Sequence, residues 1–177
     1  MGVVRRRSPC FAIFCLPAIA ASQTICIDPG HPSEVGWGTR GKKLREVDVV
    51  FDVALQLRRI LEGYGYKVVL TKRDRKQFVR NEERARIANE SKADLFLRLH
   101  CDAVKESGFA TFHPVRQGTV SGRTGPSKEV LDTSKRFAPV FHRAAIRALG
   151  KLVSDRGIRT DLQTAVGAKQ GALTGSI

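Results

Sequence analysis

Three short apolar runs alternate with two helical patterns, and this alternation constrains the fold more than any other feature. The apolar runs occupy residues 24–27, 66–70 and 95–99. Between them, apolar residues recur at helical spacing from about residue 46 to 62 and again from about 79 to 90. Strands that alternate with helices indicate a parallel sheet with helical crossovers. We therefore expect an α/β fold in a single domain, with a mostly parallel sheet flanked by helices.

The helical patterns also predict which residues are buried. In the first helix, seven apolar residues are expected on one face: Val49, Val50, Val53, Ala54, Leu57, Ile60 and Leu61. Residues 104–130 are rich in glycine and are expected to form a long surface segment, with a possible strand at 109–112. A basic helical region follows at about 131–154, in which Pro139 should cause a kink or a restart. Another short strand is possible after residue 156.

The charge of the chain bears on its partners. The chain has 177 residues, which suits one domain with a core. It contains 31 Lys and Arg against 17 Asp and Glu, and its net charge is +14. Such a surface favours polyanions such as nucleic acid, anionic lipid or anionic cell-wall polymer. Charge alone does not choose among these three classes.

Residues 1–20 have the pattern of a signal peptide. Three arginines at 5–7 precede an apolar stretch at 10–21, and Ala18-Ile19-Ala20 resembles a cleavage signal. The apolar stretch is too short to span a bilayer as a mature helix. We therefore expect a mature domain at 21–177 that is exported to the periplasm or to the extracellular cell wall, with no stable membrane span after cleavage. An N-terminal buried helix or an uncleaved anchor is the alternative.

Two histidines and one glutamate lie where chain reversals would bring them to one end of the sheet. His31 follows the first predicted strand, His100 follows the third, and Glu46 lies in the first turn of the intervening helix. In parallel sheets, ligands bind beyond the carboxyl ends of the strands. Two imidazoles and a carboxylate with an open fourth position form the ligand set of a catalytic zinc site. We therefore interpret these three residues as zinc ligands of a hydrolase.

Each of these residues has an alternative interpretation when it is taken alone. His31 could be a solvated turn residue, His100 an edge residue, and Glu46 an acid favoured by the helix dipole. The other two histidines, His113 and His142, have no comparable setting and are expected at the surface. Metal-bound histidines also need a partner for their second ring nitrogen. Three aspartates are candidates for that role: Asp28, Asp48 and Asp102.

Four separated motifs resemble those of one enzyme family. In chain order they are Asp28-Pro29-Gly30-His31, Glu46-Val47-Asp48, Arg84-Ala85-Arg86-Ile87-Ala88-Asn89, and Ala93-Asp94-Leu95-Phe96 leading to His100-Cys101-Asp102-Ala103. From residue 23 to 103 the chain resembles the zinc-dependent N-acetylmuramoyl-L-alanine amidases of type 3, which separate daughter cells. The resemblance implies Zn²⁺ bound by His31, Glu46 and His100. It further implies peptidoglycan as substrate, cleavage of the amide between N-acetylmuramic acid and L-alanine, and an activator protein as a possible partner.

The resemblance also implies a general-base glutamate on a late apolar strand. The last glutamate, Glu129, lies in a polar segment, and the acids after it are Asp132, Asp155 and Asp161. None of them lies in a buried strand pattern. We therefore expect the catalytic domain to be incomplete, with its last strand and this glutamate beyond Ile177. On that expectation the chain binds zinc but is marginally stable and poorly active, because general acid–base catalysis contributes about 10²–10⁴-fold in rate.

Three alternative functions remain open. The first is a catalytically silent module that binds zinc and cell-wall polymer. The second, a nucleic-acid-binding domain, would account for the charge but not for the ligand set. No aromatic stacking platform for bases is visible, so we expect no nucleic-acid partner. The third is another zinc amide hydrolase, although its typical His-Glu-x-x-His helix differs from the separated His–Glu–His order found here.

Overall fold

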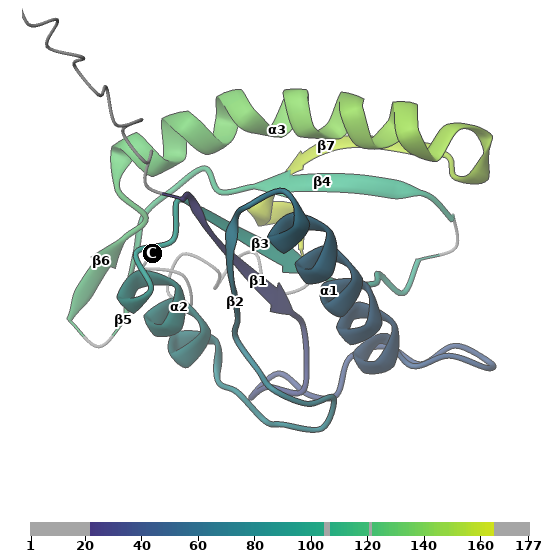
Figure 1. The fold of residues 1–177 in the computed structure, drawn as a ribbon, viewed down its shortest axis with the longest axis horizontal. Coiled ribbons are helices and arrows are strands. Elements are labelled where there is room, and N and C mark those ends of the chain that lie inside the picture. The colour runs from purple at the N-terminus through teal and green to yellow at the C-terminus, as the bar shows by residue number, and fades with distance from the viewer. Residues whose placement is uncertain (1–21, 105–106, 121, 165–177) are drawn as a thin grey trace, which may run out of the picture.

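A three-stranded parallel sheet with helices packed against it forms the first half of the protein (Figure 1). The computed structural model describes residues 22–104, 107–120 and 122–164, so the expected signal at 1–20 lies outside the described residues. The elements in chain order are β1 (Thr24–Pro29), α1 (Glu46–Gly63), β2 (Lys67–Leu70), α2 (Asn81–Glu90), β3 (Leu95–Leu99), β4 (Phe109–His113), β5 (Gly118–Val120), β6 (Arg123–Gly125), α3 (Lys128–Leu149) and β7 (Asp155–Thr160), with 3-10 turns at Gly150–Leu152 and Asp161–Gln163.

Strand β1 is the centre of the sheet, which has the order β2-β1-β3. Both neighbours run parallel to it, and Cys26 lies opposite Val69 on one side and Phe96 on the other. All six residues of β1 are buried, as expected for a strand covered on both faces. Ile25, Ile27 and the α1 residue Ala54 form the centre of the core. The prediction of an α/β fold with a mostly parallel sheet is therefore confirmed.

Helix α1 packs on this sheet with a face that differs in part from the predicted one. Val50 and Ala54 are buried as expected, but Val53 is exposed. Phe51, which the pattern did not select, is buried instead, and the cations of Lys72 and Arg75 lie over its ring. Ile60 is also exposed, whereas Leu57 and Leu61 pack against the core. The buried stripe is therefore rotated toward Val47 and Phe51, because the ring of Phe51 fills the space under the 71–76 loop.

The second half of the described chain forms a parallel strand pair covered by one long helix. Strand β4 pairs with β7, and α3 lies along both (Figure 1). Helix α3 continues from Lys128 to Leu149 through Pro139, so of the two expected effects, a kink or a restart, the restart does not occur. Proline removes one N–H from the helix, and the carbonyl that loses its partner belongs to exposed Lys135, where water can satisfy it. In the described residues, no helix is long and apolar enough to cross a membrane.

His142 is not the surface residue that the sequence predicts. Only 4% of it is exposed, because position 142 lies on the inner face of α3 together with Ala138. Its Nδ1 atom lies 2.9 Å from Oγ1 of Thr111 in β4, and its Nε2 atom lies 2.8 Å from Oδ1 of Asp155 in β7. The ring also stacks on Phe109. His142 therefore joins α3 to both strands of the pair.

Replacement of His142 by alanine should lower the free energy of unfolding. The change removes a buried ring and leaves the Thr111 hydroxyl without this partner, which should cost about 1–3 kcal/mol. Urea denaturation followed by circular dichroism measures the loss. The matched control is Arg143→Ala, which alters the exposed neighbour on the same helix and should change little. Equal stability of the His142→Ala variant and the wild type would contradict this role.

The carboxylate of Asp28 lies at the end of β1 and is completely buried. Its Oδ1 atom accepts hydrogen bonds from Arg84 of α2 and from the hydroxyl of Thr71, and its Oδ2 atom accepts one of 2.7 Å from Arg98 of β3. Burial by itself would raise the pKa of Asp28, but the charges of Arg98 and Arg84 and the hydrogen bonds from Thr71 and Arg84 lower it below its usual value. An ionised carboxylate therefore ties α2 and β3 to β1.

The guanidinium of Arg84 uses its other N–H groups on backbone carbonyls. It donates to the carbonyl oxygens of Pro29 at 2.9 Å, Pro32 at 3.0 Å and Val79 at 3.0 Å. Pro29 and Pro32 enclose the turn that follows β1. A buried cation of α2 therefore fixes the conformation of that turn, which contains His31.

Replacement of Arg84 by methionine should destabilise the fold by about 3–5 kcal/mol, because the buried carboxylate of Asp28 loses one of its two cations. Chemical denaturation at neutral pH measures this loss. Arg86→Met is the matched control, since Arg86 lies on the same helix but pairs with Glu83 and Glu90 at the surface. The control should cost less than about 1 kcal/mol. Similar losses for the two variants would show that the buried network does not carry the predicted energy.

Candidate metal centre

His31, Glu46 and His100 come together at the carboxyl edge of the three-stranded sheet. His31 follows the end of β1, His100 follows the end of β3, and Glu46 is the first residue of α1. The pairing of β1 with β3 extends to this edge, because the N–H of Gly30 donates to the carbonyl oxygen of Leu99 at 2.9 Å. One ligand atom from each of the three side chains lies within 4.8 Å of the others. We call these three residues the metal group.

The spacing of the metal group fits a small tetrahedral ion. Nε2 of His31 lies 3.7 Å from Oε2 of Glu46, and Nδ1 of His100 lies 2.9 Å from Oε1 of the same carboxylate. Two zinc bonds of about 2.0–2.1 Å at a tetrahedral angle separate their ligand atoms by roughly 3.3–3.4 Å, so the 3.7 Å between His31 and Glu46 is close to that of two zinc ligands. The shorter contact of His100 is a hydrogen bond to Glu46, which bound zinc would replace. The side chain of Glu46 is 1% exposed, that of His31 13% and that of His100 39%. The group therefore opens to solvent on the His100 side.

Glu46 is held as an ionised carboxylate by several donors. The backbone N–H groups of Thr39 and Cys101 each donate to it at 2.8 Å, and the Thr39 hydroxyl adds a longer contact of 3.3 Å. Burial alone would raise the pKa of Glu46, but hydrogen bonds from His100 and from these two backbone groups lower it to about 2. The carboxylate is therefore charged at neutral pH and fixed in orientation before any ion binds.

His31 is held as a neutral ring in a constrained turn. Its φ angle of 55° lies in the left-handed region, which is uncommon for a residue with a side chain. Lys72 donates to its carbonyl oxygen, and the Nδ1 atom of its ring lies 3.0 Å from the carbonyl oxygen of Gly36. Burial lowers the pKa of His31 below its usual value. Because a carbonyl can only accept, the proton of the neutral ring lies on Nδ1, and the lone pair on Nε2 faces Glu46.

The three aspartates proposed as partners of the histidines are used elsewhere. Asp28 is bound by the buried arginines described above, Asp48 pairs with Arg45 at 2.7 Å, and Asp102 pairs with Arg156 at 3.3 Å. Within the described residues none of these aspartates hydrogen-bonds to His31 or His100, so this prediction is wrong. The partner of His31 is a backbone carbonyl, and no residue pattern reveals such a partner in advance.

Two glycines leave the space that the side chains of the metal group occupy. A Cβ atom at Gly30 would lie 2.4 Å from Cε1 of His100. At Gly38, whose φ is +81°, a Cβ atom would lie 2.7 Å from Oε2 of Glu46 and 2.8 Å from Cδ2 of His31. Only a residue without a side chain leaves these atoms where they are. Both glycines are therefore part of the site.

No second carboxylate joins Glu46 in the metal group, in the part of the chain that the structure describes. The general-base glutamate expected from the family resemblance thus stays a prediction. The assignment of the three residues as zinc ligands is likewise a prediction, and the closeness of their ligand atoms supports it.

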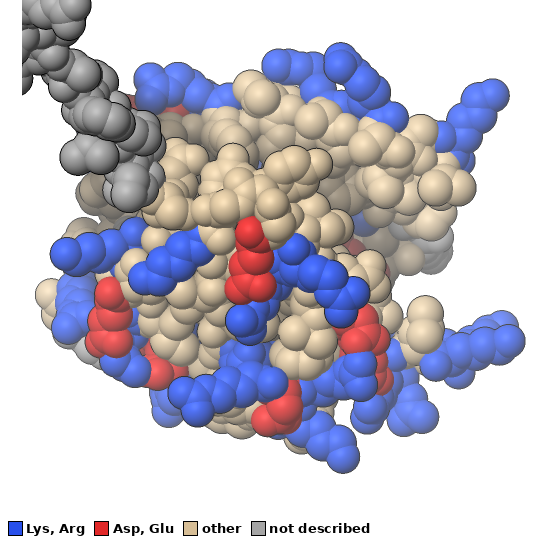
Figure 2. Space-filling model, in the orientation of Figure 1, with Lys and Arg blue, Asp and Glu red and all other residues tan. Residues whose placement is uncertain are grey.

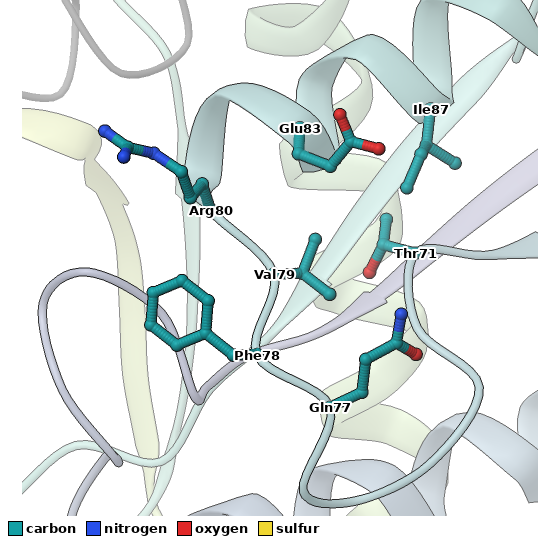
Figure 3. Close-up of a pocket in the computed structure, with 7 residues that line it drawn as sticks. All are labelled: Thr71, Gln77, Phe78, Val79, Arg80, Glu83 and Ile87. Atoms are coloured by element: carbon teal, nitrogen blue, oxygen red, sulfur yellow. The ribbon is translucent and has the colours of Figure 1, made fainter.

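A separate cavity of about 410 Å³ lies between α2 and the loop before it. Figure 3 shows its lining residues, with the side chains of Phe78 and Arg80 turned away from that of Ile87. The full lining is Thr71, Gln77, Phe78, Val79, Arg80, Glu83 and Ile87. None of these belongs to the metal group, and Thr71 is already engaged with Asp28. We therefore place the functional site at the metal group and not in this cavity.

Comparison with curated proteins finds related amidases. The chain is 34% identical over 100 residues to the N-acetylmuramoyl-L-alanine amidase AmiC of Escherichia coli O6:H1, and the match covers 55% of this chain and 24% of that protein. It is 32% identical over 163 residues to the N-acetylmuramoyl-L-alanine amidase CwlM of Bacillus licheniformis, covering 86% of this chain and 63% of that protein. The chain thus spans between a quarter and somewhat under two thirds of these relatives.

Solved structures agree on the fold. The catalytic domain of CwlV, an N-acetylmuramoyl-L-alanine amidase from Bacillus (Paenibacillus) polymyxa var. colistinus, superposes with a TM-score of 0.60 at 27% identity, covering 78% of this chain and 69% of that one. The amidase Ami1 of Mycobacterium smegmatis shares the fold with a TM-score of 0.63 at 17% identity, covering 86% of this chain and 78% of that one. Residues 25–169 match the Amidase_3 model, described as N-acetylmuramoyl-L-alanine amidase, and the chain therefore belongs to this family.

Proposed function

We propose that this protein hydrolyses the amide bond between N-acetylmuramic acid and L-alanine in peptidoglycan, with zinc held by His31, Glu46 and His100. The observation that carries the proposal is the approach of their ligand atoms to within 4.8 Å from three separate segments of the chain. Membership of the amidase family supports the choice of substrate. The donor set of two imidazoles and one carboxylate supports the choice of zinc.

Zinc bound at this site would lower the pKa of a bound water molecule and polarise the scissile carbonyl. The residues of the chain prepare the site for that chemistry. The neutral ring of His31 presents Nε2, and the carbonyl of Gly36 fixes its orientation. The charged carboxylate of Glu46 is fixed by backbone N–H groups. His100 is the most exposed member, so substrate would approach from its side. Transfer of the water's proton requires a general base, a role that the family resemblance gives to a glutamate.

The surface and the expected signal agree with a substrate outside the cytoplasmic membrane. Lys and Arg side chains are spread over the face in Figure 2, with fewer Asp and Glu among them. A basic surface attracts anionic cell-wall polymer. The signal pattern at 1–20 would export the protein to the periplasm or the cell wall. We include this location in the proposal.

A silent zinc- and wall-binding module is the second candidate. It is favoured by one observation, namely that no carboxylate besides Glu46 joins the metal group in the described residues. Such a module would bind zinc with the same three ligands and would retain cell-wall binding. It differs from the enzyme only in having no turnover.

Replacement of His31 by alanine should abolish both zinc binding and amidase activity. Zinc affinity should fall by more than about 100-fold, because losing a ligand costs at least as much as losing an outer partner of a ligand. Isothermal titration with zinc measures the affinity, and release of stem peptide from purified sacculi measures the activity. His113→Ala is the control, since His113 lies in β4 and its ring contacts the carbonyl of Pro114.

The two readouts separate the candidates. Zinc-dependent release of peptide by the wild type, lost in His31→Ala, supports the amidase. Zinc binding without turnover in the wild type supports the silent module. A wild-type chain that binds less than one zinc ion per molecule at micromolar concentration would refute the ligand assignment itself.

Replacement of Gly30 by alanine should weaken zinc binding without unfolding the protein. The added methyl group would lie 2.4 Å from the His100 ring, but this ring is partly exposed and can turn toward solvent. We expect about 10–100-fold weaker zinc binding, as for other changes that misorient a ligand. The melting temperature of the zinc-free protein should change little. Gly41→Ala is the control, because a methyl group there meets only a carbonyl at 3.6 Å. Unchanged zinc affinity in Gly30→Ala would contradict the role of the close contact.

A further inference from the structure

The loop between β1 and α1 carries one large aromatic residue between two glycines that lie against the metal group. Trp37 lies between Gly36 and Gly38, and both glycines contact the group. The carbonyl of Gly36 accepts the hydrogen bond from His31, and a Cβ atom at Gly38 would lie 2.7 Å from Oε2 of Glu46. Trp37 is therefore flanked on each side by a glycine that lies against the metal group.

The backbone is fixed on both sides of Trp37. Ser33 and Gly36 exchange two backbone hydrogen bonds of 2.9 and 3.0 Å. The N–H of Thr39 donates to Oε2 of Glu46 at 2.8 Å, and the N–H of Glu46 donates to the carbonyl of Thr39 at 2.9 Å. The backbone around Trp37 is thus in place before any ligand arrives. A ligand that binds it does not have to order this part of the loop, which removes a usual cost of binding.

The fold itself makes little use of the indole ring. Trp37 is 61% exposed, and none of the ring contacts found among the described residues involves it. Val35 and Leu44 in the same loop are also exposed. A single exposed apolar residue is ordinary, but three in one loop beside a functional site mark a contact surface. The question is which part of the substrate this surface fits.

We propose that Trp37 stacks on a sugar ring of the glycan strand and so positions the substrate at the metal group. This inference rests on the proposed function. The scissile amide is carried by the lactyl group of a sugar, so a sugar ring must lie beside the metal group when the amide reaches it. A pyranose ring has a face of C–H groups that packs on a flat aromatic surface, with its hydroxyl groups at the edge. Indole offers the largest such surface with only two side-chain torsions to fix.

Tryptophan fluorescence tests this contact directly, because Trp37 is the only tryptophan in the chain. The zinc-free full chain is titrated with a peptide-free oligomer of alternating N-acetylglucosamine and N-acetylmuramic acid. A parallel titration uses a free stem tripeptide that begins with L-alanine. We expect a saturable change in emission with the glycan and none with the peptide. No hydrolysis is needed, so the result does not depend on turnover.

Variants test whether the contact matters for binding. Trp37→Ala should weaken sedimentation with purified sacculi by about tenfold, the size expected for loss of an aromatic anchor. Trp37→Phe should retain most of the binding, because an aromatic face remains. If the chain turns over substrate, Trp37→Ala should raise KM by a similar factor with little change in kcat. The control is Tyr64→Ala, which removes an exposed aromatic side chain just after the far end of α1 from Glu46.

The outcomes distinguish this inference from the proposed function. Amidase activity with no emission change on glycan addition would overturn the stacking of Trp37 on the glycan and leave the proposed activity in place. A glycan-dependent emission change without any zinc-dependent turnover would support the stacking of Trp37 on the glycan and refute the proposed activity. An emission change with the peptide alone would assign Trp37 to binding of the stem peptide. An emission change with increasing protein concentration alone would assign it to self-association. Either result would overturn the stacking of Trp37 on the glycan.

Discussion

The charge of Asp28, buried at the end of β1, is the interaction on which the rest of the site depends. Arg84 from α2 and Arg98 from β3 neutralise it. A buried carboxylate without partners is strongly unfavourable, so β1, α2 and β3 must be in place together for this residue to be accommodated. Because Arg84 also binds the carbonyls on either side of His31, the same cation that stabilises the fold sets the position of a proposed metal ligand.

Much of the fold and the location of the site could be predicted from simple rules. Continuous apolar runs predicted β1 and β3, and parallel crossovers predicted that His31 and His100 would meet at one sheet edge. Glu46 was placed correctly because a helix start is visible in the sequence. These predictions succeeded because each depends on local pattern and on the common direction of the strands.

The details that failed depend on contacts that the chain makes only after folding. Phe51 replaces Val53 on the buried face of α1 because the 71–76 loop covers its ring. The spacing of apolar residues within the helix carries no information about a loop elsewhere in the chain. His142 is buried because Thr111 and Asp155 from two strands satisfy its ring. Arg84 was visible in a sequence motif, but its role in fixing the turn around His31 could be recognised only once the positions of the carbonyls of Pro29 and Pro32 were known. In each case the deciding partner lies far away in sequence.

The positions of the metal group along the chain have a consequence for the stability of the folded state. Glu46 and His100 are separated by 54 residues and yet are in direct contact. An ion bound to all three residues would close long loops that the unfolded chain leaves open, and it would bind the folded chain in preference. Zinc would then act as a removable staple between the first strand, the first helix and the third strand. A chelator would then lower the free energy of unfolding of the whole domain and not only empty one site.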